Sequence, residues 1–281
     1  MTNLSHHIIP GCRTKPVILD IRYEPNGQPK PVVVFCHGYK GFKDWGAWNQ
    51  VAQAFAKCGF AFVKFNFSYN GGTSEQPIDF PDEEAFAENN YSTELGDLRC
   101  VVEWLLNEEN PHRDEINLSR IQLIGHSRGG GIALLGAATI PHINRLALWA
   151  SVSDFEVRFP YGRQMKEWEE TGVWEVLNAR TGQVLKHHYQ FYEDFVRNRE
   201  VLDIRSHAKQ LKTPVLIAHG VEDEAVHFSE AMRLYKWTPE SRLEMVPETG
   251  HTFGSRHPWE EDILPEALGL VVEYTVDHFR N

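Results

Sequence analysis

The strongest local constraint in this chain is the stretch at residues 121–131, where an apolar run stops at a serine that has glycines two positions away on either side. The apolar run is typical of a buried strand, and the small and apolar residues after Ser127 are typical of a helix. So sharp a turn strains the backbone at the serine, and side chains at Gly125 and Gly129 would collide with neighbouring chain. The pattern therefore predicts that the Ser127 hydroxyl projects above the edge of a sheet.

A glycine-rich turn of this kind has other interpretations. It could cradle a phosphate or be an ordinary loop between a strand and a helix, but the chain contains no G-x-x-x-x-G-K-[ST] sequence. If Ser127 is a nucleophile, the backbone N–H of Arg128 at the start of the helix faces the developing oxyanion. A nucleophilic Ser127 requires a base and an acid from the rest of the chain.

Apolar runs alternate with amphipathic segments along most of the chain. Residues 31–36, 60–67, 121–126, 145–150 and 214–220 are typical of strands, and residues 45–57, 95–106, 132–138 and 264–279 are typical of helices. Alternation of this kind predicts an α/β fold with a mostly parallel sheet covered by helices on both faces, and ligands bind such sheets at the carboxyl ends of the strands. We also expect residues 17–23 and 31–36 to be antiparallel neighbours, because Asn26-Gly27 between them can form a tight turn.

The alternation breaks at residues 154–208, which carry many aromatic residues among charges and show a helical but no strand signal. Connections this long are uncommon in compact domains and are usually functional. We therefore predict a helical lid at residues 154–208, inserted into a core formed by residues 1–153 and 209–281. The alternative is an ordinary helical connection that is rich in aromatic residues.

Two further polar loops follow strand-like runs in the last quarter of the chain. Asp223 comes directly after the run at 214–220, with Glu222 and Glu224 as alternatives, and His251 follows a short run at 242–247. A lone aspartate or histidine in a loop is usually solvated. Three residues of suitable chemistry, each just after a separate strand, make a less common coincidence, and they favour a catalytic triad.

The sequence G-x-S-x-G, the acidic residue four positions after the His-Gly histidine, and the late Gly-His pair resemble the α/β-hydrolase family. The resemblance implies an eight-stranded sheet with a lid after strand 6, and a triad of Ser127, Asp223 and His251. It also implies an oxyanion hole formed by the N–H groups of Arg128 and Tyr39. Because the nucleophile is a serine, the dehalogenase and epoxide-hydrolase branches are disfavoured.

Within this family the chain looks similar to small esterases that cleave cinnamoyl- or feruloyl-type aromatic-acid esters, with the acylaminoacyl-peptidase-like branch second. We expect a small-molecule carboxylic ester as substrate and an acyl-enzyme intermediate, with aromatic acyl groups preferred. The candidate pocket residues share large apolar faces, and they are Phe42, Trp168, Trp174, Tyr189 and Phe191. Aminoacyl-peptidase-like or thioesterase activity, and a non-enzymatic binding module, stay open as alternatives.

Composition excludes several classes of partner. The formal net charge of -11 argues against nucleic-acid binding, and no apolar segment approaches the length of a membrane span. We expect no metal and no cofactor, because the adjacent pairs His6-His7 and His187-His188 point their rings apart and no H-E-x-x-H sequence occurs. Four scattered cysteines and the absence of a leader-like start lead us to expect a cytoplasmic protein, and a homodimer is kept open.

Overall fold

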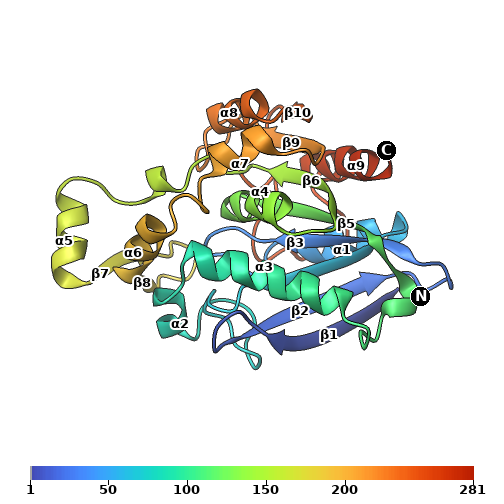
Figure 1. The fold of residues 1–281 in the computed structure, drawn as a ribbon, viewed down its shortest axis with the longest axis horizontal. Coiled ribbons are helices and arrows are strands. Elements are labelled where there is room, and N and C mark those ends of the chain that lie inside the picture. Colours follow the sequence, from blue (N-terminus) through green and yellow to red (C-terminus); the bar gives the residue numbers. More distant parts are fainter. Residues whose placement is uncertain (1) are drawn as a thin grey trace.

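The computed structural model describes residues 2–281, which contain one eight-stranded sheet in the order β1-β2-β4-β3-β5-β6-β9-β10 (Figure 1). The strands are β1 (Asn3–Pro10), β2 (Pro16–Tyr23), β3 (Lys30–Cys36), β4 (Ala61–Asn66), β5 (Ile116–His126), β6 (Ile143–Trp149), β9 (Val215–Gly220) and β10 (Ser241–Val246). All pairs from β4 to β10 are parallel, whereas β2 is antiparallel to both of its neighbours. The predicted mostly parallel α/β sheet is confirmed.

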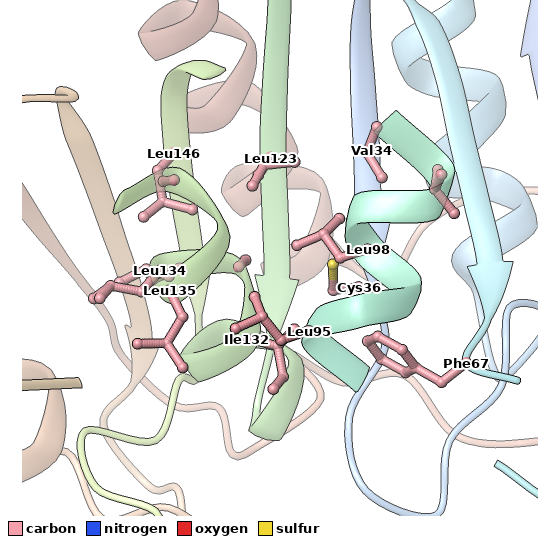
Figure 2. Packing of buried hydrophobic residues seen from close by; sticks show 14 of the residues in the cluster. Val34, Cys36, Phe67, Leu95, Leu98, Leu123, Ile132, Leu134, Leu135 and Leu146 are labelled. Carbon is pink, nitrogen blue, oxygen red and sulfur yellow. The ribbon is translucent and has the colours of Figure 1, made fainter. Parts of the chain in front are cut away.

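Helices cover both faces of this sheet. One face carries α1 (Trp48–Lys57) and α9 (Glu266–Arg280), and the other carries α3 (Tyr91–Leu106), α4 (Arg128–Thr139), α7 (Ile204–Gln210) and α8 (Ser229–Trp237). Each face therefore has its own apolar core. Figure 2 shows Leu95 of α3 next to Ile132 of α4, with Leu123 further along β5 in the same cluster. These cores hold the strand ends in place.

The expected pairing of residues 17–23 with residues 31–36 is wrong, because β4 lies between β2 and β3. Asn26-Gly27 does form a turn, with Gly27 at a φ of 69°. However, the whole of residues 24–29 separates the two strands. A loop of this length does not set a hairpin register as a two-residue turn would. The antiparallel partner of β2 on its other side is β1, which begins at Asn3.

The insertion is not purely helical, which corrects the predicted helical lid. It contains η2 (Glu156–Arg158), α5 (Arg163–Thr171), the antiparallel strands β7 (Val173–Leu177) and β8 (Val184–His188), and α6 (Gln190–Arg197). The two strands form their own sheet, which lies apart from the main sheet in Figure 1. Five-residue strands interleaved with charges give too little alternation to be recognised.

Two shorter helical elements complete the chain: α2 (Glu83–Ala87) and η1 (Arg113–Glu115). All four cysteines are free; Cys36 is buried, whereas Cys12 is exposed. Within residues 2–281, no helix combines the length and the apolar character that a membrane crossing requires.

A buried cluster of charges connects β2 and β4 to the loop that follows β3. Asp20 of β2 accepts hydrogen bonds from Lys43 Nζ at 2.8 Å and from Lys64 Nζ at 2.6 Å. Asp44 pairs with both lysines, and the side chains of Asp20, Lys43 and Lys64 are at most 5% exposed. Burial opposes ionisation of Asp20, but the two ammonium groups hold its pKa at about 2. The cluster therefore fixes the start of the loop through a fully paired set of charges.

We expect this cluster to make stability depend on acid. Because the pKa of Asp20 is lower in the folded chain than the ordinary 3.8, its contribution of about 2 kcal/mol is present above about pH 4 and is lost as the pH falls towards about 2. Asp20→Asn should be less stable than the parent at neutral pH, and the difference should shrink by about that amount on acidification. Chemical denaturation across this pH range measures it, with the exposed Asp114→Asn as control. A difference between Asp20→Asn and the parent that does not change with pH would contradict the expectation.

Candidate active site

Ser127 occupies the turn between β5 and α4, in the strained conformation that its glycine neighbours predict. Its φ is 56° and its ψ is -122°, a combination that side-chain-bearing residues rarely adopt. The Ser127 N–H donates to the carbonyl of Trp149 at 2.9 Å, and its own carbonyl accepts from Val152 N–H at 3.2 Å. A Cβ added to Gly125 or Gly129 would lie 2.3 or 2.4 Å from backbone oxygens. The predicted collisions at both glycines are confirmed.

The structure brings Ser127, His251 and Asp223 together although they are far apart in sequence. His251 Nε2 lies 2.9 Å from Ser127 Oγ, and His251 Nδ1 lies 2.8 Å from Asp223 Oδ2. The serine follows β5, the aspartate follows β9, and the histidine follows β10, so all three stand at the carboxyl edge of the sheet. With Nδ1–H donating to the carboxylate, Nε2 is free to accept the hydroxyl proton.

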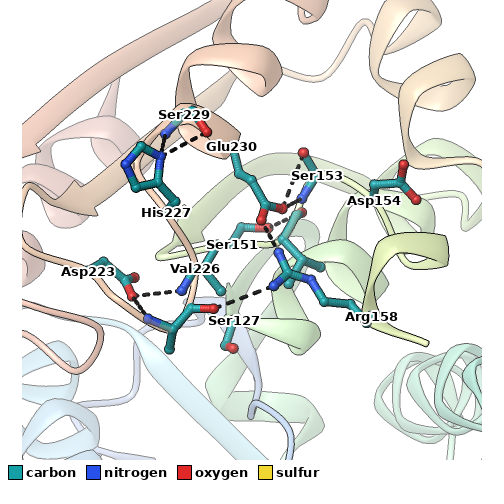
Figure 3. A network of polar contacts seen from close by, with 12 residues as sticks. Ser127, Ser151, Ser153, Asp154, Arg158, Asp223, Val226, His227, Ser229 and Glu230 are labelled. Atoms are coloured by element: carbon teal, nitrogen blue, oxygen red, sulfur yellow. Dashed lines mark hydrogen bonds and ion pairs between the residues drawn. The ribbon is translucent and has the colours of Figure 1, made fainter. Parts of the chain in front are cut away.

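Asp223 is held as an ionised and immobile group. Its Oδ1 accepts from the N–H groups of Ala225 at 2.9 Å and Val226 at 2.8 Å, the second of which is drawn in Figure 3. Burial alone would raise its pKa, but hydrogen bonds from His219 and His251 hold the pKa far below the ordinary value. The alternatives Glu222 and Glu224 are exposed. The geometry therefore singles out Asp223 within this loop.

Two further histidines support the triad residues, and the sequence did not reveal them. His126 is buried, and burial together with the nearby His251 lowers its pKa to about 3, so its neutral ring can donate Nε2–H to the carbonyl of His251 at 2.9 Å. His219 lies 3.2 Å from Asp223 through Nε2, which also bonds the carbonyl of Val226. The only available signals were the position of His126 inside the serine motif and that of His219 four residues before Asp223.

Tyr39 of the loop after β3 and Arg128 of α4 line the same cavity as Ser127. A Cβ added to Gly38 would lie 2.9 Å from the Cβ of Ser127, so the loop after β3 packs directly on the nucleophile. Arg128 is the first residue of α4, and neither its N–H nor that of Tyr39 donates to another group within residues 2–281. N–H groups without an acceptor at the start of a helix, such as that of Arg128, can bind a negatively charged atom.

A cavity of about 380 Å³ opens above Ser127 and His251. The other residues of its walls are mainly aromatic, apolar or basic, and they are Tyr39, Lys40, Tyr91, Arg128, Val152, Phe155, Arg158, Trp174, Phe191, Ala225 and Val226. Trp174 and Phe191, two of the predicted pocket residues, line this cavity. Tyr91 and Phe155 were missed because a single aromatic residue in a helix or loop looks like ordinary core.

Three of the predicted pocket residues do not line this cavity. Phe42 is fully buried and packs against Phe80, with ring centroids 6.4 Å apart. Trp168 is 1% exposed and donates its indole N–H to the carbonyl of His187 at 2.9 Å. Tyr189 packs edge-on against Trp168. These three aromatic residues instead pack within the loop after β3 and within the insertion. The prediction was wrong for them because composition does not distinguish a buried aromatic residue from one that lines a pocket.

Arg128 forms a buried ion pair with Glu94. Its Nη1 lies 3.2 Å from Oε1 of Glu94 in α3, and its guanidinium lies 4.2 Å from the centroid of the Tyr39 ring. Glu94 also accepts from the side-chain amide of Asn89 at 2.8 Å. Burial raises the pKa of Glu94, and Arg128 opposes that rise. The pair therefore connects α3, α4 and the loop after β3.

One group of side chains has the donor atoms of a metal site. His188, Glu84 and Glu88 bring ligand-type atoms within 4.8 Å of one another between β8 and α2. The His188 ring already bonds Glu88 at 2.7 Å, and Arg13 lies 3.7 Å from the same carboxylate. None of these residues lines the cavity above Ser127.

Comparison with known proteins agrees with this architecture. The chain is 25% identical over 276 residues to the acylamino-acid-releasing enzyme of Rattus norvegicus, covering 90% of this chain and 33% of that protein. It is 29% identical over 170 residues to the serine hydrolase BPHL of Homo sapiens, covering 54% of this chain and 55% of that protein. The chain thus spans about a third and about half of the lengths of these curated relatives.

Solved structures of esterases share the fold. Est1E from Butyrivibrio proteoclasticus, solved with ferulic acid bound, superposes with a TM-score of 0.67 at 19% identity, covering 98% of this chain and 100% of that chain. In addition, residues 31–190 match the family described as alpha/beta hydrolase fold. This match includes Ser127, its elbow and the loop after β3, and the chain therefore belongs to the alpha/beta hydrolase fold family.

Proposed function

We propose that this chain is a serine hydrolase that cleaves small carboxylic esters through an acyl-enzyme intermediate. The observation that carries the proposal is the continuous hydrogen-bonded series from Ser127 through His251 to Asp223, with the serine on a strained turn. A serine that merely completed a turn would need neither the histidine nor the buried carboxylate behind it.

In the first half of the reaction, Ser127 Oγ attacks the ester carbonyl while His251 Nε2 takes its proton. Asp223 keeps the ring oriented and stabilises the imidazolium that forms. The N–H groups of Tyr39 and Arg128 hold the tetrahedral oxyanion, and His251 then gives its proton to the leaving alcohol. In the second half, His251 activates a water that attacks the acyl-enzyme, and the free acid leaves as Ser127 regains its proton.

The shape of the cavity favours an aromatic acyl group. Three aromatic residues of the insertion, Phe155, Trp174 and Phe191, give it flat apolar walls beside Ser127. Rings of this kind pack well against an aromatic acid. Est1E, whose fold is shared, has been solved with ferulic acid bound. We assign the cavity to the acyl part of the substrate.

A second candidate is the release of acylated amino acids from small amides. It is favoured by the alignment with the acylamino-acid-releasing enzyme over 90% of this chain. The same triad serves both reactions, because esters and amides pass through similar tetrahedral intermediates. A panel of 4-nitrophenyl esters and acetyl-aminoacyl anilides distinguishes the two by their kcat/KM.

Ser127→Ala tests the main proposal. We expect it to fold normally and to lose at least about 10³-fold in esterase kcat, since the triad acts as a unit. A fluorophosphonate probe should label the parent protein at Ser127 and leave the variant unlabelled. Retention of most of the activity by a clean Ser127→Ala preparation would rule out the serine mechanism.

Gly38→Ala tests the oxyanion loop. The added Cβ meets the Cβ of Ser127 at 2.9 Å, so the loop must move and the Tyr39 N–H must leave its place. We expect kcat to fall by about 10²-fold with a much smaller change in KM. Gly269→Ala in α9 is the control, because a Cβ there meets nothing within 4 Å. Equal kcat values for the two variants would contradict the assignment of the Tyr39 N–H to the oxyanion hole.

Trp174→Ala tests the aromatic wall. The ratio of kcat/KM for a 4-nitrophenyl cinnamate to that for the acetate should exceed about tenfold in the parent, and most of this preference should be lost in the variant. Trp259→Ala is the matched control, since Trp259 packs at the α1 and α9 face. If Trp174→Ala kept the full preference, the insertion would not determine acyl specificity.

A further inference from the structure

The walls of the cavity above Ser127 carry basic side chains although the protein as a whole is acidic. The chain has a formal net charge of -11. Three basic residues nevertheless line the cavity, namely Lys40, Arg128 and Arg158, and no carboxylate side chain is among its lining residues. The partners of these three residues within the protein determine how much positive charge is left for a substrate.

Arg158 is neutralised within the protein. Figure 3 shows its guanidinium between the carboxylate of Glu230 and the backbone of the loop after β9. Its Nη1 donates to the carbonyl of Ala225 at 3.4 Å. Glu230 is held in turn by the N–H of Ser153 at 2.7 Å. This pair braces the cavity and leaves no net charge on that wall.

Arg128 and Lys40 together have one carboxylate for two positive charges. Arg128 makes a single side-chain hydrogen bond, from Nη1 to Glu94, although a guanidinium has five N–H donors. Lys40 Nζ donates to the carbonyl of Leu177 at 3.2 Å, and no carboxylate lies within 4.0 Å of it in the part of the chain that the structure describes. The wall therefore keeps one uncompensated positive charge.

The two cations line the same cavity, and both lie near the ring of Tyr39. Arg128 lies 4.2 Å and Lys40 lies 5.4 Å from the centroid of the Tyr39 ring, so the two charges are less than 10 Å apart. The backbone of Lys40 is left-handed, with a φ of 52°, and this conformation is strained for a lysine. Burial and the charge of Arg128 lower the pKa of Lys40, as expected where no carboxylate compensates the ammonium group.

We propose that the natural substrate carries a free carboxylate on its acyl part, bound in this cavity by Lys40 together with Arg128. The substrate class is then a half-ester of a dicarboxylic acid. Ser127 attacks the carbonyl of the carboxyl group that is esterified with an alcohol, and the two cations hold the other, free carboxylate. This proposal deepens the esterase function and rests on it. Charge-assisted hydrogen bonds from an ammonium and a guanidinium are among the strongest available for a carboxylate.

The test compares mono-4-nitrophenyl adipate with 4-nitrophenyl methyl adipate, which has the same leaving group and chain but no charge. We expect kcat/KM to favour the anionic ester by at least about tenfold in the parent protein. Raising the salt concentration from about 0.05 to about 0.5 M should reduce this preference. In Lys40→Met the preference should fall by about tenfold, and Lys40→Arg should retain most of it.

Lys166→Met is the control, since it removes the same charge from an exposed position on α5 and should leave the preference unchanged. Equal or faster hydrolysis of the neutral ester by the parent would overturn the carboxylate site while the esterase function stood. An equal loss on both esters in Lys40→Met, with the ratio unchanged, would also overturn it. Absence of hydrolysis of any ester, with Ser127 unlabelled by a fluorophosphonate, would instead reject the esterase function itself.

Discussion

The strained turn at Ser127 is the constraint on which the rest of this structure depends. A residue at a φ of 56° and a ψ of -122° is stable only where its surroundings hold it. Here, β6 supplies the carbonyl of Trp149 that accepts from the Ser127 N–H, and the chain beyond β6 supplies the N–H of Val152. The sheet and α4 then hold the two ends of the turn. The position of the hydroxyl is thus a property of the whole sheet edge and not of the motif alone.

The loop after β3 is the second element that this edge needs, and it is held from two sides. Below it, the charge cluster around Asp20 and Lys64 fixes Lys43 and Asp44. Above it, the insertion contributes His187 of β8, whose Nε2 lies 2.7 Å from the hydroxyl of Tyr39. Burial keeps the pKa of His187 well below the ordinary value, so the contact is between neutral groups. The insertion is thereby connected to a residue that lines the cavity together with Ser127.

The elbow and the order of the three polar loops could be predicted because each depends on short-range signals. The glycines around Ser127 and the polar residues directly after buried strands are local patterns. The aromatic pocket could not be predicted in the same way. Trp168 and Trp174 are six residues apart in the same insertion, yet one fills its core and the other lines the cavity. Composition shows that such residues are present, and only their packing shows which of them face the substrate.

The sequence by itself determined the α/β class, the mostly parallel sheet and the polar loops that meet at its edge, because periodicity and turn chemistry are encoded locally, while the choice of Asp223 over Glu222 and Glu224 came from the family resemblance. Only the tertiary structure decided the place of β4 between β2 and β3, the hairpin within the insertion and the support of the triad by His126 and His219. It alone also decided the partners of the cavity cations, since Glu94 is 34 residues from Arg128 along the chain. Charge pairing and strand order depend on contacts between distant segments, and no local pattern specifies them.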